Sequence, residues 1–164
     1  KYFILIPGSA WSQKQWRVEK YIELAKLCEK KYEMTPVVIG SKKDVICSEI
    51  VMGLSKKTID LSGKTNFRES MSIISNATIS MGSDTGFIYA SEALDIPTIV
   101  ILGPTSIETG AGVFSKKSIN VYKNDIWCRP CSQNGSFPCY RKTQFCMTEI
   151  DTDDVLMSVE KLIA

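Results

Sequence analysis

Apolar and polar residues follow two periods along the chain, one typical of buried strands and one typical of helices. The predicted strands are residues 2–6, 36–40, 58–63, 77–81, 98–103 and, more weakly, 119–122. The predicted helices place one apolar face each at Val18, Tyr21, Ile22, Ala25 and Cys28; at Val45, Ile46, Ile50 and Leu54; at Phe67, Met71 and Ile74; within residues 83–94; and at Val155, Leu156, Val159, Leu162 and Ile163. Asn66 and Glu69 have the spacing of a capping box.

Strands that alternate with helices build a parallel sheet with helices on both faces. The sequence therefore predicts an α/β fold, a Rossmann-like doubly wound parallel sheet. With 164 residues, of which 44% are hydrophobic, the chain has the length of one domain, or of half of a larger enzyme, and can bury a core. It starts at Lys1, without methionine and directly in a strand, so we expect a domain taken from a longer protein.

Charge and hydropathy exclude two classes of protein. Twenty Lys and Arg against eighteen Asp and Glu give a net charge of +2, whereas nucleic-acid binders carry a clear, clustered basic excess. No apolar run approaches the ~20 residues of a membrane span. Pro7 and Gly8 interrupt the first apolar run too early for a signal peptide. We therefore expect neither a nucleic-acid partner nor a transmembrane segment.

Three turns rich in Gly, Ser and Thr directly follow predicted strands. They are PGSAWSQK (7–14), SDTG (83–86) and GPTS (103–106). Ser83, Asp84 and Thr85 are good N-caps, and the free N–H groups and dipole of the following helix suit phosphate. One such turn often only caps a helix. Three at one edge of a sheet favour a phosphate-bearing ligand, for which Lys14 supplies a charge, unless it is an ordinary surface lysine.

Four stretches together resemble one family, the heptosyltransferases of lipopolysaccharide synthesis, glycosyltransferase family nine. They are PGSAWSQKQW (7–16), DLSGKTNFRE (60–69), MGSDTGFIYASEALDIPTIVILGPT (81–105) and the cysteine pattern after Trp127. The resemblance covers essentially the whole chain. It implies that residues 1–164 are the carboxyl-terminal, donor-binding half of a GT-B fold, and that the amino-terminal, acceptor-binding domain is absent from this chain.

The resemblance implies that the anion is the diphosphate of a nucleotide sugar, with ADP-heptose the usual donor. By position, Lys14 matches the family lysine that contacts the donor phosphates, and Asp84, Thr85 and Gly86 match its D-[ST]-G triplet. We expect Lys14 and Asp84 to carry this half's catalytic contribution. Ser9 and Thr105 are further expected polar contacts. Asp44 either accepts from ribose hydroxyls, as an acid after this strand commonly does, or is a surface residue.

Tyr89 departs from the family pattern, because many members place a histidine there. The chain contains no histidine, which excludes histidine acid/base chemistry within these residues. A tyrosine can still donate to a phosphate oxygen, or simply line an amphipathic wall.

The family chemistry is inversion, in which a base of the amino-terminal domain activates the acceptor hydroxyl and the nucleoside diphosphate departs. It requires no cofactor. It implies a lipopolysaccharide or other glycan acceptor, bound through the missing domain. It also implies a cytoplasmic location at the inner face of a bacterial inner membrane, with peripheral membrane association. Two alternatives stay open: a non-catalytic nucleotide or sugar-phosphate binding module, and an epimerase-like GT-B enzyme.

Four cysteines form a cluster in the sequence, at Cys128, Cys131, Cys139 and Cys146. A CxxC pair followed by two more cysteines suits a structural zinc ion, although a standard ribbon would end in a second CxxC. The alternatives are two disulfides or free thiols that pack a loop. In each case we expect a structural role apart from the transfer chemistry.

Overall fold

The computed structural model describes residues 1–163 and contains a six-stranded, wholly parallel sheet of order β3-β2-β1-β4-β5-β6. The strands are β1 (Tyr2–Ile6), β2 (Thr35–Val38), β3 (Ile59–Asp60), β4 (Ile79–Ser83), β5 (Thr98–Ile101) and β6 (Ser118–Val121). The helices are α1 (Val18–Tyr32), α2 (Val45–Gly53), α3 (Phe67–Ile74), α4 (Gly86–Ala93), α5 (Phe145–Thr148) and α6 (Thr152–Ile163), with 3-10 turns η1 (Ser12–Lys14) and η2 (Ile107–Thr109). The predicted doubly wound sheet is confirmed.

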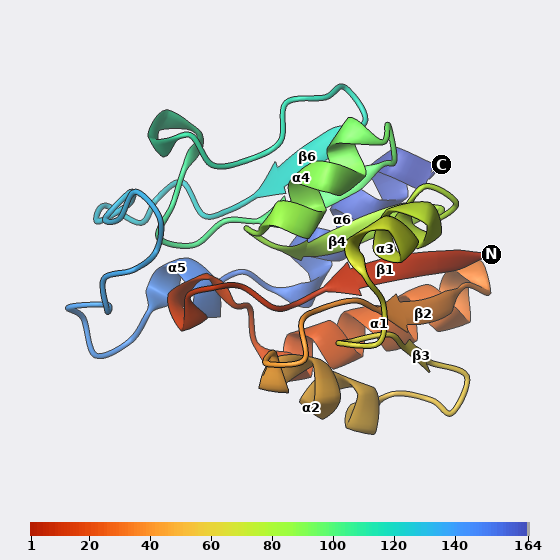
Figure 1. Cartoon of the computed structure of the whole chain (residues 1–164). Helices are drawn as coiled ribbons and strands as arrows, with labels where there is room; N and C mark the ends of the chain where they lie inside the picture. The colour runs from red at the N-terminus through yellow and green to blue at the C-terminus, as the bar shows by residue number, and fades with distance from the viewer. Residues whose placement is uncertain (164) are drawn as a thin grey trace.

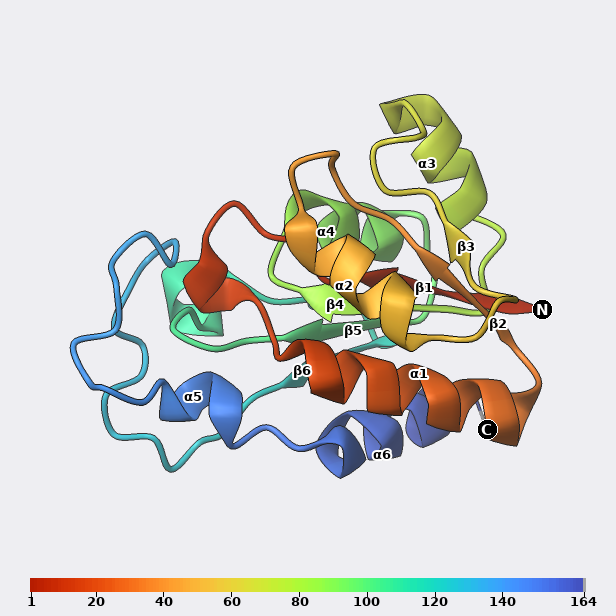
Figure 2. The ribbon, with the colours of Figure 1, turned by 90° about the horizontal axis from the view of Figure 1, so that it is seen from below.

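The sheet has a hydrophobic core on each face, because successive strand residues point to opposite sides. In β1, Phe3 and Leu5 join the core that α1, α2 and α6 cover, whereas Ile4 and Ile6 join the core that α3 and α4 cover. Figure 2 shows α1 and α6 side by side below the sheet and α3 and α4 above it. Burial on both faces explains why the strands are continuous apolar runs.

The capping box predicted for α3 is present. Asn66 Oδ1 accepts from the Glu69 backbone N–H at 3.0 Å, and the Asn66 N–H donates to Glu69 Oε2 at 2.8 Å. The two bonds satisfy donors that the first helical turn leaves free. They fix where α3 starts.

Element boundaries differ from the predictions, most clearly at β3 and at the start of α4. The predicted strand at 58–63 pairs only over Ile59–Asp60, and α4 begins at Gly86, because Thr85 is its extended N-cap. Between β5 and β6, where the sequence predicts no helix, the described chain has only the short turn η2. Residues 122–144 form a long loop that runs beyond the carboxyl ends of the strands, on the left of Figure 1.

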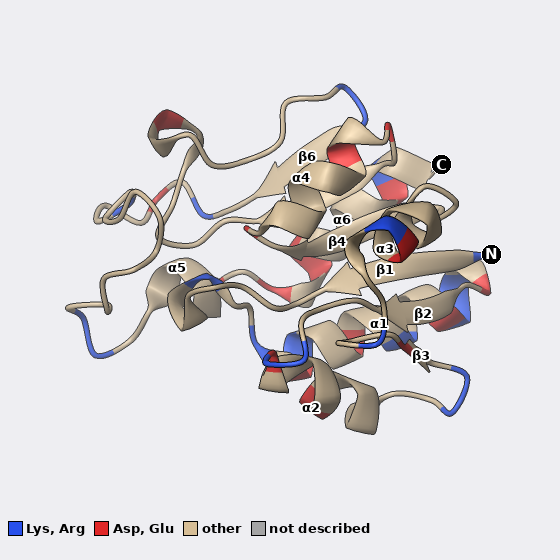
Figure 3. Cartoon of the chain, viewed as in Figure 1, with Lys and Arg blue, Asp and Glu red and all other residues tan. Residues whose placement is uncertain are grey.

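Acidic and basic residues are interspersed over the helices and loops (Figure 3). Within residues 1–163 no helix is long and apolar enough to cross a membrane.

Candidate functional site

The loops after β1 and β4 lie side by side at the carboxyl edge, because these two strands pair in the middle of the sheet. Here the chain order of the strands reverses, which is where doubly wound sheets bind ligands. Gly82 permits the close approach: a Cβ atom there would lie 2.1 Å from the carbonyl oxygen of Ile6. The switch point thus brings the first and second predicted turns together.

Asp84 is the centre of a buried polar cluster at this point. Its side chain is only 7% exposed, and its Oδ2 lies 3.2 Å from Lys14 Nζ and 2.9 Å from the Thr105 hydroxyl, which donates to it. Tyr89 donates to Asp84 Oδ1. Ser9 Oγ donates to the Asp84 backbone carbonyl at 3.1 Å. Four other predicted site residues therefore meet at Asp84, three at its carboxylate and Ser9 at its backbone carbonyl.

The cluster satisfies the electrostatic needs of a buried carboxylate. Lys14 supplies the opposite charge from a side chain that is itself only 12% exposed. Burial, and next the hydrogen bond to Asp84, raise the pKa of Tyr89 above its ordinary value, so its hydroxyl stays protonated and donates. The same hydroxyl accepts from the Gly112 N–H at 3.2 Å. Tyr89 thus ties Asp84 to the loop after β5.

A hollow beside this cluster is lined in part by Thr85, and the space next to Gly86 is open. Thr85 lines a cavity of about 210 Å³ together with Gly8, Ser9, Ala10 and Asp44, among others. No heavy atom lies within 4 Å of the position that a Gly86 Cβ would occupy. The first backbone N–H groups of α4 have no partner within the helix. The helix start therefore offers donors, a positive dipole end and free space to an anion.

Asp44 faces the same hollow from the loop after β2. It precedes α2, and its Oδ2 accepts from the Ser41 N–H at 2.6 Å. Its carboxylate packs on Gly8, where a Cβ atom would lie 2.5 Å from Asp44 Cγ. A second hollow of about 560 Å³ continues from there past Trp11, Ser12, Gln15 and Lys43. Of the eight residues predicted for ligand binding, Ser9, Asp44 and Thr85 thus line these two adjoining hollows.

The four clustered cysteines are all free thiols. Cys131 is exposed, Cys128 and Cys139 are half-buried, and Cys146 is buried. All four line one small cavity with Phe137, Tyr140 and Phe145, among others. Within residues 1–163, however, no three cysteine or carboxylate side chains are arranged to hold a metal ion. The thiols as placed do not fit zinc, and a zinc site here stays a prediction.

Sequence reasoning missed how the cysteine segment, residues 128–146, packs on the site. Its Cys131 and Ser132 N–H groups donate to the Pro104 carbonyl at 3.1 and 3.3 Å, and Gln144 Nε2 donates to the Gln13 carbonyl. Gly135 lies against the stem of Lys14. The segment contacts two of the three turns, and its expected structural role apart from the transfer chemistry stays a prediction. No periodic signal marks such contacts in the sequence.

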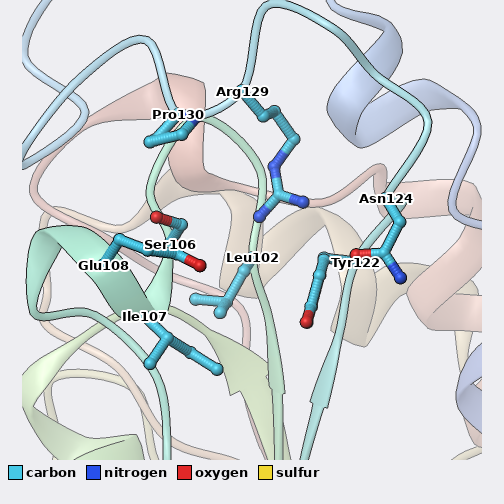
Figure 4. A pocket seen from close by; sticks show the side chains of 8 residues that line it. All are labelled: Leu102, Ser106, Ile107, Glu108, Tyr122, Asn124, Arg129 and Pro130. Atoms are coloured by element: carbon cyan, nitrogen blue, oxygen red, sulfur yellow. The ribbon is translucent and has the colours of Figure 1, made fainter.

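A further cavity of about 190 Å³ lies at the ends of β5 and β6. Its lining residues are Leu102, Ser106, Ile107, Glu108, Tyr122, Asn124, Arg129 and Pro130. Figure 4 shows the Arg129 guanidinium pointing from its loop toward Leu102 and Tyr122. It lies 4.7 Å from the Tyr122 ring centroid and donates to the carbonyls of Gly103, Lys123 and Thr105. Arg129 thereby fastens the loop to the GPTS turn.

A doubly wound sheet whose switch point carries an anion-suited helix start defines a Rossmann-like domain with a candidate anion site. Residues 1–140 match the model of glycosyltransferase family 9 (heptosyltransferase), and the chain belongs to this family of enzymes. It is 28% identical over 105 residues to lipooligosaccharide heptosyltransferase 2 of Haemophilus influenzae, a match over 61% of this chain and 30% of that protein. It is 21% identical over 178 residues to lipopolysaccharide heptosyltransferase 1 of Pseudomonas aeruginosa, a match over 99% of this chain and 48% of that protein.

Two solved structures share the fold. E. coli ADP-heptose LPS heptosyltransferase II superposes with a TM-score of 0.77 at 21% identity, over 99% of this chain and 46% of that one. E. coli heptosyltransferase WaaC with ADP-2-deoxy-2-fluoro heptose superposes with a TM-score of 0.72 at 16% identity, over 98% of this chain and 42% of that one. The chain thus spans about half, or less, of the length of these proteins.

Proposed function

We propose that this chain is the donor-binding half of an inverting heptosyltransferase that uses ADP-heptose and a lipopolysaccharide core acceptor. The observation that carries the proposal is the Lys14–Asp84 pair beside the open start of α4. Family membership favours a transferase over a non-catalytic nucleotide module. The WaaC structure with an ADP-heptose analogue supports the choice of donor.

The diphosphate would lie at the start of α4, between Thr85 and Gly86 on one side and Ser9 on the other. Lys14 has three N–H donors, of which one faces Asp84. The remaining donors are available to phosphate oxygens, where a charged hydrogen bond is stronger than a neutral one. The hollow that runs past Asp44 has room for the ribose and base, with Asp44 as acceptor for ribose hydroxyls.

Asp84 has a positioning role in this proposal and does not itself contact phosphate. Its carboxylate is nearly buried, pairs with the Lys14 ammonium group and accepts hydrogen bonds from the Thr105 and Tyr89 hydroxyls. A second negative charge next to an unshielded carboxylate would be repelled, whereas the lysine neutralises Asp84 and would give its remaining donors to the phosphate. The aspartate expected to be catalytic thus acts through the groups it holds.

Catalysis by this half would consist of stabilising the charge that develops on the departing diphosphate and of orienting the sugar. Lys14 and the start of α4 supply the positive potential. The base that activates the acceptor would come from the acceptor-binding domain, outside these residues. That no cofactor takes part, that a lipid-linked glycan is the acceptor, and that transfer occurs at the cytoplasmic face of the inner membrane are parts of this proposal.

The proposal is tested by a transfer assay with the complete protein to which this chain belongs. ADP-heptose and a heptose-deficient core acceptor should give ADP and an acceptor heavier by one heptose, as read by mass spectrometry. UDP-sugars serve as donor controls. Release of ADP without acceptor gain, or transfer from UDP-sugars alone, would contradict it.

A further inference from the structure

The cysteine segment contacts the site at the stem of Lys14. A Cβ atom at Gly135 would lie 2.6 Å from Lys14 Cγ and 2.8 Å from Lys14 Cδ, closer than real Cβ atoms come to other atoms. The residue therefore has to be glycine for the lysine to keep its place. Lys14 is 12% exposed, although lysines are mostly exposed on protein surfaces. Its stem is held by Gly135 and its ammonium group by Asp84.

Gly135 is itself fixed by a buried serine of the same segment. Its N–H donates to Ser132 Oγ at 2.8 Å, and Ser132 is 6% exposed. The Ser132 N–H donates to the Pro104 carbonyl at 3.3 Å. Pro104 precedes Thr105, whose hydroxyl donates to Asp84. These contacts form a closed path from the carboxylate, through the GPTS turn and the cysteine segment, back to the lysine.

A lysine side chain that is confined in this way loses less conformational entropy when it binds a ligand. A free lysine side chain samples many rotamers, and fixing it on a ligand costs conformational entropy. A stem confined before the ligand arrives has already lost that freedom, so more of the phosphate interaction appears as affinity. The effect is specific to the phosphate part of a ligand, because only that part meets the ammonium group.

We propose that Gly135, held by Ser132, is a positioning residue for Lys14, and that the cysteine segment thereby sets the affinity of the site for a nucleoside diphosphate. The inference rests on the proposed function for the identity of the ligand. The placement of Lys14 itself does not depend on any ligand. The two claims can therefore fail separately.

Two glycine-to-alanine variants of the complete protein separate the effect of the contact with Lys14 from the effect of backbone strain. Gly135 and Gly110 have nearly the same backbone angle, φ +80° and +84°, but no heavy atom lies within 4 Å of a Cβ at Gly110. Both variants to alanine carry the same strain, and only Gly135→Ala displaces Lys14. Gly135→Ala should weaken ADP binding roughly tenfold and adenosine binding less than twofold. Equal losses of ADP affinity in both variants would overturn the inference.

A second readout follows Lys14 without ligand. Acetylation by acetic anhydride, with each lysine quantified by mass spectrometry, should be slow at Lys14 and faster by roughly fivefold or more in Gly135→Ala, because a displaced side chain is exposed. Gly110→Ala should leave the rate unchanged. The same Lys14 rate in both variants would overturn the inference. If wild-type protein shows the expected rates but binds no ADP, the proposed function fails and the positioning role stands.

A double variant completes the test. If Gly135 acts through the lysine, Gly135→Ala should cause no further loss of ADP affinity in a Lys14→Ala background, and a loss as large as in wild type would contradict the inference. Should Gly135→Ala fail to fold, Ser132→Ala removes the hydrogen bond that fixes Gly135. It should also speed acetylation of Lys14, and an unchanged rate there would equally count against the inference.

Discussion

Lys14 Nζ lies 3.2 Å from Asp84 Oδ2, and this pair joins the loop after β1 to the loop after β4. The two strands are neighbours in the sheet although two other strands lie between them in the chain. The pair therefore exists only once the crossover from β3 to β4 has formed. It places one positive charge close to the free N–H groups at the start of α4.

Replacing Lys14 by alanine should weaken ADP binding by roughly 1.5–3 kcal/mol, or tenfold or more, because a charged hydrogen bond to phosphate is lost. Adenosine binding should stay nearly unchanged. Isothermal titration calorimetry measures both. Lys161→Ala, at an exposed position of α6, is the matched control. Equal losses for ADP and adenosine would show that the lysine acts on the fold instead.

Gly86→Val should fold but lose ADP affinity. The space next to Gly86 is open, so the side chain meets no protein atom at its Cβ, yet it occupies the volume in which a diphosphate would approach α4. Gly86→Ala should give an intermediate loss. Circular dichroism checks the fold and calorimetry the affinity. An unchanged ADP affinity in a folded Gly86→Val protein would rule out binding at this turn.

Thr105→Val should lower the free energy of unfolding by about 1.5–3 kcal/mol, because the buried, charged Asp84 carboxylate loses the hydrogen bond that Thr105 donates. Urea denaturation measures the change. Thr58→Val is the control, because Thr58 Oγ1 is buried without a hydrogen-bond partner among the described residues. Removing that hydroxyl should be neutral or stabilising. Similar losses in the two variants would contradict the role given to Thr105.

Thiol alkylation should follow burial. Desolvation raises the pKa of the Cys28 and Cys47 thiols to about 12, so near pH 8 almost none is thiolate, the reactive form. Cys131 is exposed and should be modified first, at a rate that rises with pH. Iodoacetamide labelling with peptide mass spectrometry gives the order. Labelling of Cys28 as fast as Cys131 would contradict the structure.

The zinc prediction has its own test. If zinc holds Cys128, Cys131, Cys139 and Cys146, elemental analysis of protein purified without chelator should give about one metal per chain, and those thiols should resist alkylation until chelator is added. Two disulfides would instead leave only Cys28 and Cys47 free under denaturing conditions. Six free thiols without metal would leave the segment held by packing alone.

Local rules predicted most of the fold. Continuous apolar runs marked the strands because both faces of the sheet are covered, and the box at Asn66 and Glu69 marked the start of α3. The brevity of β3 was not predicted, because the apolar content of residues 58–63 resembles that of a regular strand. Tertiary pairing decides those boundaries, and sequence periodicity does not record it.

The site was predictable where topology forces convergence and unpredictable where packing decides. Parallel strands carry all their following turns to one edge, so Ser9, Asp84 and Thr105 were expected to meet. That Asp84 is the buried hub, and that Gly135 touches Lys14, depends on how a long loop folds back. A glycine in a loop gives no sign of the side chain that it accommodates.

The central claim is that the start of α4, with Lys14, binds the diphosphate of a nucleotide sugar. Calorimetric titration of the complete protein with ADP-heptose, ADP, adenosine and a UDP-sugar tests it most directly. The account predicts that ADP-heptose and ADP bind, and that adenosine and the UDP-sugar bind far more weakly. Affinity for adenosine equal to that for ADP, or no binding of any nucleoside diphosphate, would contradict it.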